Sequence, residues 1–240
     1  MKLSVIIVHY RTPELLKLCL KRLEEHLRGI EYEIKVIDNS NNNIGFARGV
    51  NRGLRETTGE YRLILNPDAL ITENAVQKML AYMDAHEDIG MLGPQLKYFN
   101  NEHQRSYRRF YKPFTILARR SPFFKKENDR FLMNDTDPNR IQTPDWILGA
   151  AMLVRSSVIE KVGLMDERFF LYFEDVDWCR RFWHNGSKVV YFPDAVFYHY
   201  YPRLSATVNR TALWHLASAV KYFWKYRNLQ KSSALLSSSH

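Results

Sequence analysis

The N-terminal third of the chain alternates short apolar runs with segments whose apolar residues recur every three or four positions. Residues 3–10 form an almost continuous apolar run, which is typical of a strand buried on both faces of a sheet. Pro13 suits the first turn of a helix, Thr12 can cap it, and an apolar stripe continues to Leu27. Further strands are expected at 33–38 and 61–66, and further helices at 45–57 and 73–86. This order predicts a parallel sheet with right-handed crossovers.

The second half of the chain has a less regular pattern. Residues 97–142 mix basic and aromatic side chains with prolines and are expected to form an irregular excursion. Beyond it we expect a strand at 146–154, helices from Ser156 and from near Glu174, a short strand at 188–192 and a last helix at 211–229. No repeat and no linker rich in glycine, serine or proline divides the chain. The pattern predicts one α/β domain with a single mixed, mainly parallel sheet flanked by helices, followed by a C-terminal helical appendage.

The composition is that of an ordinary globular protein. Of the 240 residues, 45% are hydrophobic and 25% are charged, which excludes disordered, collagen-like and disulfide-scaffold proteins. The longest apolar runs, such as residues 150–154, are far shorter than the ~20 residues that a membrane span requires. The first strand follows Met1 directly, so no secretory signal is expected. Cys19 and Cys179 match no metal or redox spacing and are expected to be buried thiols in a cytoplasmic protein.

The net charge of +9 is distributed unevenly. No acidic residue follows Asp194, and the lysines and arginines beyond it contribute +6. Residues 97–133 contribute a further +7, which leaves −4 for the rest of the chain. A mildly acidic body with two basic stretches indicates an anionic partner, which can be a phosphate group, a nucleic acid or a membrane surface.

Polar residues stand where the predicted parallel strands end, and such ends bind the ligands of α/β sheets. The first strand ends at 9–12 without glycine, which excludes a dinucleotide fingerprint and a phosphate-binding P-loop. The second ends at Asp38, whose carboxylate can accept hydrogen bonds from a ribose or a base, or can cap a turn. The third ends at 66–68, where Asp68 can hold Mg²⁺ or Mn²⁺ beside a diphosphate, or can form an Asx turn.

Three carboxylates gather where an aromatic run meets the start of a helix. Residues 169–173 precede Glu174, Asp175 and Asp177. The helix dipole favours negative charge at this position, which explains one or two of the three without any chemical role. An apolar wall raises the basicity of a carboxylate, so one of them can serve as a general base. Asp175 and Asp177 lie about 200° apart on a helix and therefore do not share one task.

The order of these motifs resembles the inverting, GT-A-fold members of glycosyl transferase family 2, and more narrowly their bacterial rhamnosyltransferase-type branch. The matching segments follow the family's order and cover residues 3 to about 205: they are 4–10, 36–40, 43–51, 65–68, 149–152, 169–180 and His199. The resemblance implies a GT-A domain over 1–205, with a nucleotide-sugar-binding part at 1–96 and an acceptor-binding and catalytic part at 97–205. The basic segment 206–240 lies outside it.

The resemblance also implies roles for individual residues. Tyr10 and Asp38 would contact the nucleoside. The rest of the donor pocket would be lined by Asn43, Gly45, Arg48, Asn51 and Asn66. Asp68 and His199 would bind a divalent cation, Mg²⁺ or Mn²⁺, and Asp175 would be the catalytic base. The first position of the family's metal motif is Asn66 here rather than Asp, which leaves one fewer carboxylate for the metal.

Candidates for the acceptor side lie in the second half of the chain. They are Asp145, Trp146, Gly149 and Glu174. The segment 107–124 can clamp a pyrophosphate on the acceptor with its aromatic residues and with Arg108, Arg109, Arg119 and Arg120, or it can form a solvated loop packed on the sheet. The implied activity is inverting transfer of a hexose or deoxyhexose, such as rhamnose, from a dTDP- or UDP-sugar. The acceptor would be a saccharide or lipid-linked saccharide in cell-surface polysaccharide synthesis.

Other functions stay open at this point, as does the role of the C-terminal helix. Nucleotidyl transfer also uses a metal and an α/β nucleotide site, but it needs a glycine-rich basic loop that residues 8–13 lack. Charge alone suggests a nucleic-acid-binding module, and since no motif supports it, no nucleic-acid partner is expected. The helix at 211–229 can dock on its own domain, mediate a homodimer, or lie at an anionic membrane surface on the inner face of the cell membrane.

Overall fold

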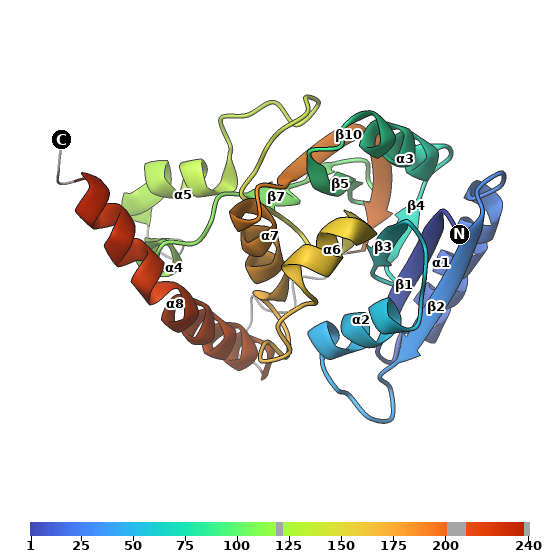
Figure 1. Cartoon of the computed structure of the whole chain (residues 1–240), viewed down its shortest axis with the longest axis horizontal. Coiled ribbons are helices and arrows are strands. Elements are labelled where there is room, and N and C mark those ends of the chain that lie inside the picture. Colours follow the sequence, from blue (N-terminus) through green and yellow to red (C-terminus); the bar gives the residue numbers. More distant parts are fainter. Residues whose placement is uncertain (119–121, 201–209, 238–240) are drawn as a thin grey trace.

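A mixed β-sheet runs through the molecule (Figure 1). The computed structural model describes residues 1–118, 122–200 and 210–237. Within them, the strands of this sheet are β1 (Leu3–His9), β2 (Tyr32–Asp38), β3 (Tyr61–Leu65), β4 (Ala69–Ile71), β5 (Ile89–Lys97), β6 (His103–Gln104), β9 (Ala151–Arg155) and β10 (Lys188–His199). A separate pair joins β7 (Tyr107–Arg108) to β8 (Trp146–Ile147).

The strand order across the sheet is β2-β1-β3-β9-β5-β10-β4, with β6 paired to β5. Strands β2 and β3 both run parallel to β1, and β10 runs parallel to β5. Strand β9 is antiparallel to both β3 and β5, so most strands of the sheet share one direction. The predicted mixed, mainly parallel sheet is therefore confirmed. Parallel alignment brings the carboxyl ends of β1, β2 and β3 together at one edge of the sheet.

Helices cover both faces of the sheet. They are α1 (Pro13–His26), α2 (Phe46–Arg55), α3 (Ala75–Ala85), α4 (Pro113–Ala118), α5 (Lys125–Leu132), α6 (Ser156–Val162), α7 (Glu174–His184) and α8 (Arg210–Ser237), with a 3₁₀ turn at Pro122–Phe124. Alternate residues of β1 serve two cores: Ile6 and Val8 pack with α2, whereas Val5 and Ile7 pack with α1 and α3. The apolar run at 3–10 is thus buried on both faces, as predicted.

Two glycines allow α2 to pack closely against β1. A Cβ on Gly49 would lie 2.7 Å from Cγ1 of Val8, and one on Gly53 would collide with Ile6. The helix therefore lies closer to β1 than any side chain would allow. This close approach keeps the start of α2 beside the carboxyl end of β1, at the edge where the predicted donor residues stand.

The largest difference from the predicted elements is β5, a nine-residue strand between β9 and β10. Its two glycines and Pro94 give it no strand pattern, yet Gly93 is required because a Cβ there would lie 2.8 Å from Ile147. Strand β4 and most of β10 were not predicted either. The predicted strand at 146–154 is two strands, β8 and β9, separated by 148–150. The expected irregular excursion contains α4 and α5.

The C-terminal helix α8 is longer than predicted and packs on its own domain. Ser218, Ala219, Tyr222 and Tyr226 are buried along one side of it. Tyr222 and Tyr226 belong to the same core as α7, and Figure 1 shows α8 lying across that end of the molecule. Docking on the domain, one of the alternatives for this helix, is therefore confirmed for its inner face. Residues 201–209, which contain the predicted boundary at 205, lie outside the described residues.

Candidate functional site

The carboxyl ends of β1 and β2 place His9, Asp38 and Ser40 together. The backbone N–H of Ser40 donates to Oδ1 of Asp38 at 2.7 Å, and the Ser40 hydroxyl lies 3.3 Å from Nε2 of His9. These hydrogen bonds from Ser40 hold the pKa of the Asp38 carboxyl below its ordinary value. The Asp38 side chain is 59% exposed, so an ionised carboxylate is available at this edge for a donor N–H or O–H of a ligand.

Tyr10 follows His9, the residue of β1 that pairs with Asp38, and is 45% exposed. The guanidinium of Arg11 lies 5.4 Å from the centre of the Tyr10 ring. Arg11 itself has a φ of 53°, which L-residues rarely adopt, and its backbone N–H donates to Oγ of Ser40. The turn after β1 therefore presents an aromatic face and a cation beside Asp38, an arrangement that suits a nucleotide.

Asn43 and Gly45 shape the loop that leads into α2. The Gly45 N–H donates to Oδ1 of Asn43 at 3.0 Å. Gly45 has a φ of 89°, and a Cβ there would lie 2.7 Å from the carbonyl oxygen of Phe170. The Phe46 N–H donates to that same carbonyl at 2.9 Å. Asn43 therefore fixes the turn of the loop, Gly45 leaves room for the carbonyl of Phe170, and Phe46 bonds the loop to the segment that precedes α7.

Arg48 and Asn51 of α2 both face Glu167. Nε of Arg48 lies 3.6 Å from a Glu167 carboxylate oxygen, and the Arg48 side chain is 58% exposed. Asn51 is 1% exposed, and its amide bonds to the backbone N–H and C=O of Met165 and to Glu167. We therefore assign Asn51 a positioning role rather than the direct donor contact that the sequence predicts, whereas Arg48 stays accessible to a ligand.

Asp68 and His199 meet because β10 pairs antiparallel with β4. Nε2 of His199 lies 3.4 Å from Oδ1 of Asp68. On the other side of the ring, Nδ1 of His199 donates to Oε1 of Gln104 at 2.8 Å. This bond fixes the orientation of the ring and directs Nε2 towards the Asp68 carboxylate. Oδ1 of Asp68 makes no hydrogen bond within the described part of the chain.

Two electron-rich atoms that face each other favour a cation between them. An imidazole nitrogen and a carboxylate oxygen suit a divalent cation that keeps its other positions for water and phosphate oxygens. No group of three His, Cys, Asp or Glu residues suited to a metal occurs in the described ranges. The pair therefore fits a cation held jointly with a diphosphate. Gln104 was not predicted, and no sequence motif marks it.

Asn66 connects this region to the carboxylates at the start of α7. Its backbone N–H donates to the carbonyl of Ala150 at 2.9 Å. The N–H of the adjacent Gly149 donates to Oδ2 of Asp175 at 3.0 Å. A Cβ on Gly149 would lie 3.4 Å from Cβ of Asp175, so this glycine lets the 148–150 segment approach the carboxylate. Gly149 thus orients Asp175 through its backbone.

Glu174 and Asp175 begin α7 and are 5% and 7% exposed. Oδ1 of Asp175 accepts a second backbone hydrogen bond, from Val176 at 2.8 Å. Burial raises the pKa of Asp175, while the two backbone N–H groups and the charge of Arg108 oppose the rise. Burial and the charge of Asp175 raise the pKa of Glu174 well above its ordinary value. The pair therefore favours a neutral Glu174 beside an ionised and unusually basic Asp175.

The predicted acceptor residues near Asp175 have different surroundings. Trp146 is 3% exposed and its Nε1 donates to the carbonyl of Arg109, so it packs in the core rather than offering a surface to a sugar. Asp145 accepts hydrogen bonds from the Phe110 N–H and from Arg109. Arg108 lies 5.2 Å from the Trp146 ring, and its Nε has no partner within the described residues. Arg119 and Arg120 lie outside those residues.

Sequence reasoning missed that α8 contacts the start of α7, the helix that carries the predicted base. Asp177 is fully buried, and it accepts hydrogen bonds from Tyr226 of α8 at 2.8 Å and from Arg181 at 2.9 Å. Lys225 of α8 makes ion pairs with both Asp177 and Asp166. The periodicity of 211–229 predicted the helix, but no local pattern reveals that its inner side chains neutralise a carboxylate of α7.

The segment before α7 is strained, and α8 contacts it as well. Tyr172 and Phe173 both have a φ of 69°, immediately before Glu174. Oγ of Ser218 donates to the carbonyl of Leu171 at 2.9 Å, and Nζ of Lys221 donates to that of Arg168 at 2.8 Å. Such backbone strain persists only where the surroundings hold it. The position of Asp175 therefore depends on α8.

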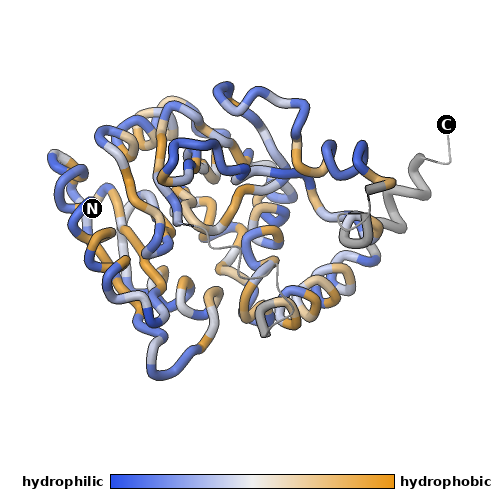
Figure 2. Tube along the Cα trace, turned by 180° about the vertical axis from the view of Figure 1, so that it is seen from behind, coloured by the Kyte–Doolittle hydropathy of each residue, from blue (hydrophilic) through white to orange (hydrophobic). Residues whose placement is uncertain are grey.

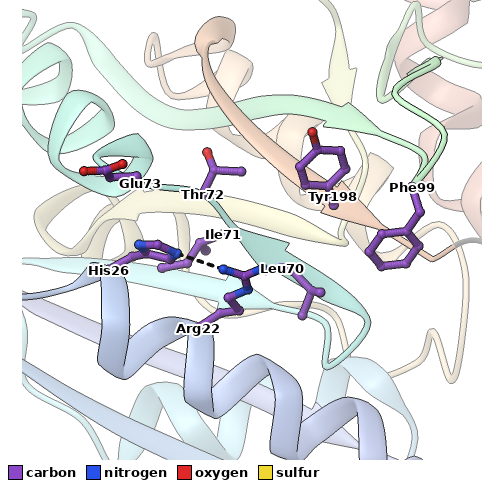
Figure 3. Close-up of a pocket in the computed structure, with 8 residues that line it drawn as sticks. All are labelled: Arg22, His26, Leu70, Ile71, Thr72, Glu73, Phe99 and Tyr198. Atoms are coloured by element: carbon purple, nitrogen blue, oxygen red, sulfur yellow. Dashed lines mark hydrogen bonds between the residues drawn. The ribbon is translucent and has the colours of Figure 1, made fainter.

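A cavity of about 420 Å³ opens elsewhere, between α1 and β4. Figure 3 shows its lining: Arg22, His26, Leu70, Ile71, Thr72, Glu73, Phe99 and Tyr198. Tyr198 and His199 are successive residues of β10, so their side chains point to opposite faces of the sheet. The cavity is thus separated from the Asp68–His199 pair by the strand itself, and it contains none of the predicted site residues.

Comparison with known proteins places this geometry in context. A family described as glycosyl transferase family 2 matches residues 20–143. The chain is 27% identical to rhamnosyltransferase WbbL of Escherichia coli K12, over 88% of this chain and 80% of that protein. It is also 27% identical to N-acetylglucosaminyl-diphospho-decaprenol L-rhamnosyltransferase of Mycobacterium tuberculosis, over 66% of this chain and 56% of the relative.

A solved structure with the same fold is that of GalNAc-T7 with UDP, GalNAc and Mn²⁺. It superposes with a TM-score of 0.61 at 13% identity, over 83% of this chain and 43% of that one. At this identity the likeness shows the fold alone, and the predicted GT-A fold is confirmed. The present chain thus spans most of one relative but about half of the M. tuberculosis protein and of this solved chain.

Proposed function

Because the chain belongs to glycosyl transferase family 2, we propose that it transfers a sugar from a nucleotide diphosphate to an acceptor hydroxyl, with inversion at the anomeric carbon. The observation that carries the proposal is the placement of three groups at one edge of the sheet. They are the exposed carboxylate of Asp38, the Asp68–His199 pair and the buried carboxylate of Asp175. These match the needs of the reaction: nucleoside contact, a diphosphate site and a base.

The donor and acceptor are proposed from the relatives. Two of them are named as rhamnosyltransferases, which supports a deoxyhexose donor, and we infer dTDP-rhamnose ahead of a UDP-sugar. The name of the M. tuberculosis relative supports an acceptor sugar linked through a diphosphate to a lipid. The product would enter cell-surface polysaccharide synthesis at the inner face of the membrane. The family assignment leaves nucleotidyl transfer and nucleic-acid binding without support.

The Asp68–His199 pair is proposed as the diphosphate end of the donor site. These two residues would hold Mg²⁺ or Mn²⁺, which when bound neutralises the charge that develops on the departing diphosphate. Gln104 bonds Nδ1 of His199 and so directs Nε2 towards Asp68, which makes Gln104 a positioning residue. The first metal-motif position is Asn66 rather than an acid, so the protein supplies one carboxylate at this site.

Asp175 is proposed as the base. Its carboxylate accepts the proton of the acceptor hydroxyl while that oxygen forms a bond to the anomeric carbon on the face opposite the leaving group. The bond from the anomeric carbon to the phosphate oxygen breaks, and its electron pair leaves with the nucleotide diphosphate. Attack from the opposite face inverts the configuration. Burial makes Asp175 more basic than a solvated carboxylate, which favours this proton transfer.

The test is a donor panel with a defined acceptor. UDP-, dTDP- and GDP-linked sugars would each be incubated with a synthetic N-acetylglucosaminyl diphosphate lipid and Mn²⁺, and the released nucleotide would be measured. We expect transfer from dTDP-rhamnose, with a product whose anomeric configuration is inverted by NMR. Transfer from another donor would correct the sugar but keep the activity. Retention of configuration, or no transfer from any donor, would overturn the proposed function.

A further inference from the structure

Helix α8 has two faces with opposite surroundings. Its inner face holds Tyr222 and Tyr226, which are 0% and 4% exposed. Its outer face carries four large apolar side chains that are 57–66% exposed: Leu213, Leu216, Val220 and Trp224. With 3.6 residues per turn, these four fall within an arc of about 80°. They form one continuous apolar line, which we call the α8 stripe.

The stripe is unusual for this protein's surface. Twelve large hydrophobic side chains are exposed among the described residues, and a third of them lie on this one helix face. Single exposed apolar residues are normal on a soluble domain, but a contiguous row marks an interaction surface. Because the inner face already packs on α7, the stripe is not needed for docking α8 on its own domain.

Positive charge lies within and beside the stripe. Arg227 falls inside the same arc, and its guanidinium lies 4.4 Å from the centre of the Trp224 ring. Lys221 lies on the flank, where it is exposed; its Nζ donates to the backbone carbonyl of Arg168, a neutral acceptor that leaves the positive charge uncompensated. No acidic residue follows Asp194 in the sequence, so nothing on α8 offsets these cations. Figure 2 shows hydrophobic and hydrophilic positions alternating along this helix.

We propose that the α8 stripe docks on an anionic lipid bilayer. Apolar side chains would enter the boundary between headgroups and acyl chains, Trp224 would lie at the interface, and Lys221 and Arg227 would meet anionic headgroups. None of the helices in the described ranges is both long and apolar enough to cross a bilayer, so the contact is peripheral. The proposal rests on the proposed function for its purpose, which is to hold the enzyme beside a lipid-linked acceptor.

A second copy of the chain fits this face less well than a bilayer. A symmetric contact between two α8 stripes would enclose Lys221 and Arg227 of both copies in one interface, with no acidic side chain on either helix to pair with them. An anionic surface provides the opposite charge.

The test measures binding to vesicles in the absence of donor and acceptor, so its outcome is independent of the proposed activity. The full chain would be sedimented with vesicles of phosphatidylcholine alone or with phosphatidylglycerol added, at low and high salt. We expect binding to the anionic vesicles that weakens with salt, and little binding to neutral ones. The triple variant Leu216→Ser, Val220→Ser, Trp224→Ser should lose at least about tenfold in partitioning, and Arg227→Gln about fivefold, the equivalent of about 1 kcal/mol.

Matched controls lie on α1, where Leu18 is 40% exposed and Lys17 is also exposed. Leu18→Ser and Lys17→Gln should bind as the wild type does. Val220→Ser alone, a milder change at a 62% exposed position, provides the test if the triple variant is poorly folded. Equal binding of wild type and stripe variants would overturn the proposal, as would equal binding to neutral vesicles. A wild-type dimer that the stripe variants convert to a monomer, without vesicle binding, would assign the stripe to a second copy.

Discussion

The three carboxyl groups within four residues of α7 are expected to respond in three different ways to replacement by an amide. Asp175 is buried with two backbone donors, Glu174 is buried with one oxygen unpartnered within the described residues, and Asp177 is buried among cationic and hydroxyl donors. Changing each to its amide keeps the shape of the side chain. The three variants therefore separate the contribution of each carboxyl group to turnover from its contribution to stability, within one turn of one helix.

The Asp175→Asn variant removes the proton acceptor. A positioned general base contributes ~10²–10⁴-fold to turnover, so kcat should fall by at least ~10²-fold. The KM for the donor should change little, because the base meets the acceptor hydroxyl rather than the nucleotide. The new amide also places an NH₂ opposite one of the N–H groups of Gly149 and Val176, so a stability loss of about 1–3 kcal/mol is expected alongside.

The two neighbours provide matched controls. Burial and the charge of Asp175 keep Glu174 neutral, so Glu174→Gln replaces one neutral group by another, and kcat should stay within about threefold of wild type. Asp177→Asn removes the charge that Arg181 and Lys225 face, and both of those side chains are only 21% exposed. Breaking a buried pair in this way costs about 3–5 kcal/mol of stability. Asp177→Asn should therefore lose activity because the protein is less stable, whereas Asp175→Asn should stay folded and turn over slowly.

The assay combines initial rates of nucleotide release with urea unfolding of the same preparations. Turnover at saturating acceptor gives the effect on kcat, and the unfolding midpoint with its slope gives the effect on stability. A folded Asp175→Asn enzyme with most of its activity would refute the assignment of the base, especially if Glu174→Gln were inactive. An Asp177→Asn protein as stable as wild type would refute the view that the contacts of α8 with Asp177 stabilise α7.

The first three strands and helices could be predicted because their patterns are local. The apolar run of β1, the stripe of α1 and the polar residues at the strand ends each follow from the chemistry of consecutive residues. Strand β5 has no such pattern: it holds two glycines and Pro94, and its conformation depends on pairing with β9 and β10 on either side. Tertiary pairing, which lies outside any sequence window, decides such strands.

The same distinction applies to the site. The family resemblance predicted site roles for Asp38, Asp68, His199 and Asp175. The fold brings the last residue of β10, His199, against Asp68, the residue before β4. Gln104 could not be found, because its contact with the imidazole crosses 95 positions of sequence. An aromatic residue such as Trp146 can face either a ligand or the core, and only its 3% exposure shows that it lies in the core.

The remaining predictions concern the donor site, the pH profile and the contacts between α8 and α7. Asp68→Ala should weaken the binding of dTDP in Mn²⁺, measured by calorimetry, by at least about tenfold and leave thymidine binding unchanged, since the cation would contact only phosphate. A chelator should have the same effect on the wild type, and an equal loss of affinity for both ligands would contradict the metal role. Arg108→Gln removes a positive charge that lowers the pKa of Asp175, so the acidic limb of the kcat/KM profile should move to higher pH. Arg109→Gln, whose partner is Asp145, should leave that limb in place. An unmoved limb in the Arg108 variant would exclude an effect of Arg108 on Asp175. Tyr226→Phe should lower the free energy of unfolding by about 1.5–3 kcal/mol, because its hydroxyl is one of the donors to the fully buried Asp177 carboxylate. The same variant should lower kcat more than it changes the donor KM, because α8 holds the strained segment that precedes Asp175, the proposed base. Tyr198→Phe loses a hydrogen bond of similar length at an exposed site, so it should cost less than about 1 kcal/mol and leave kcat unchanged. Equal effects of the two tyrosine variants on both stability and turnover would show that α8 merely covers the domain.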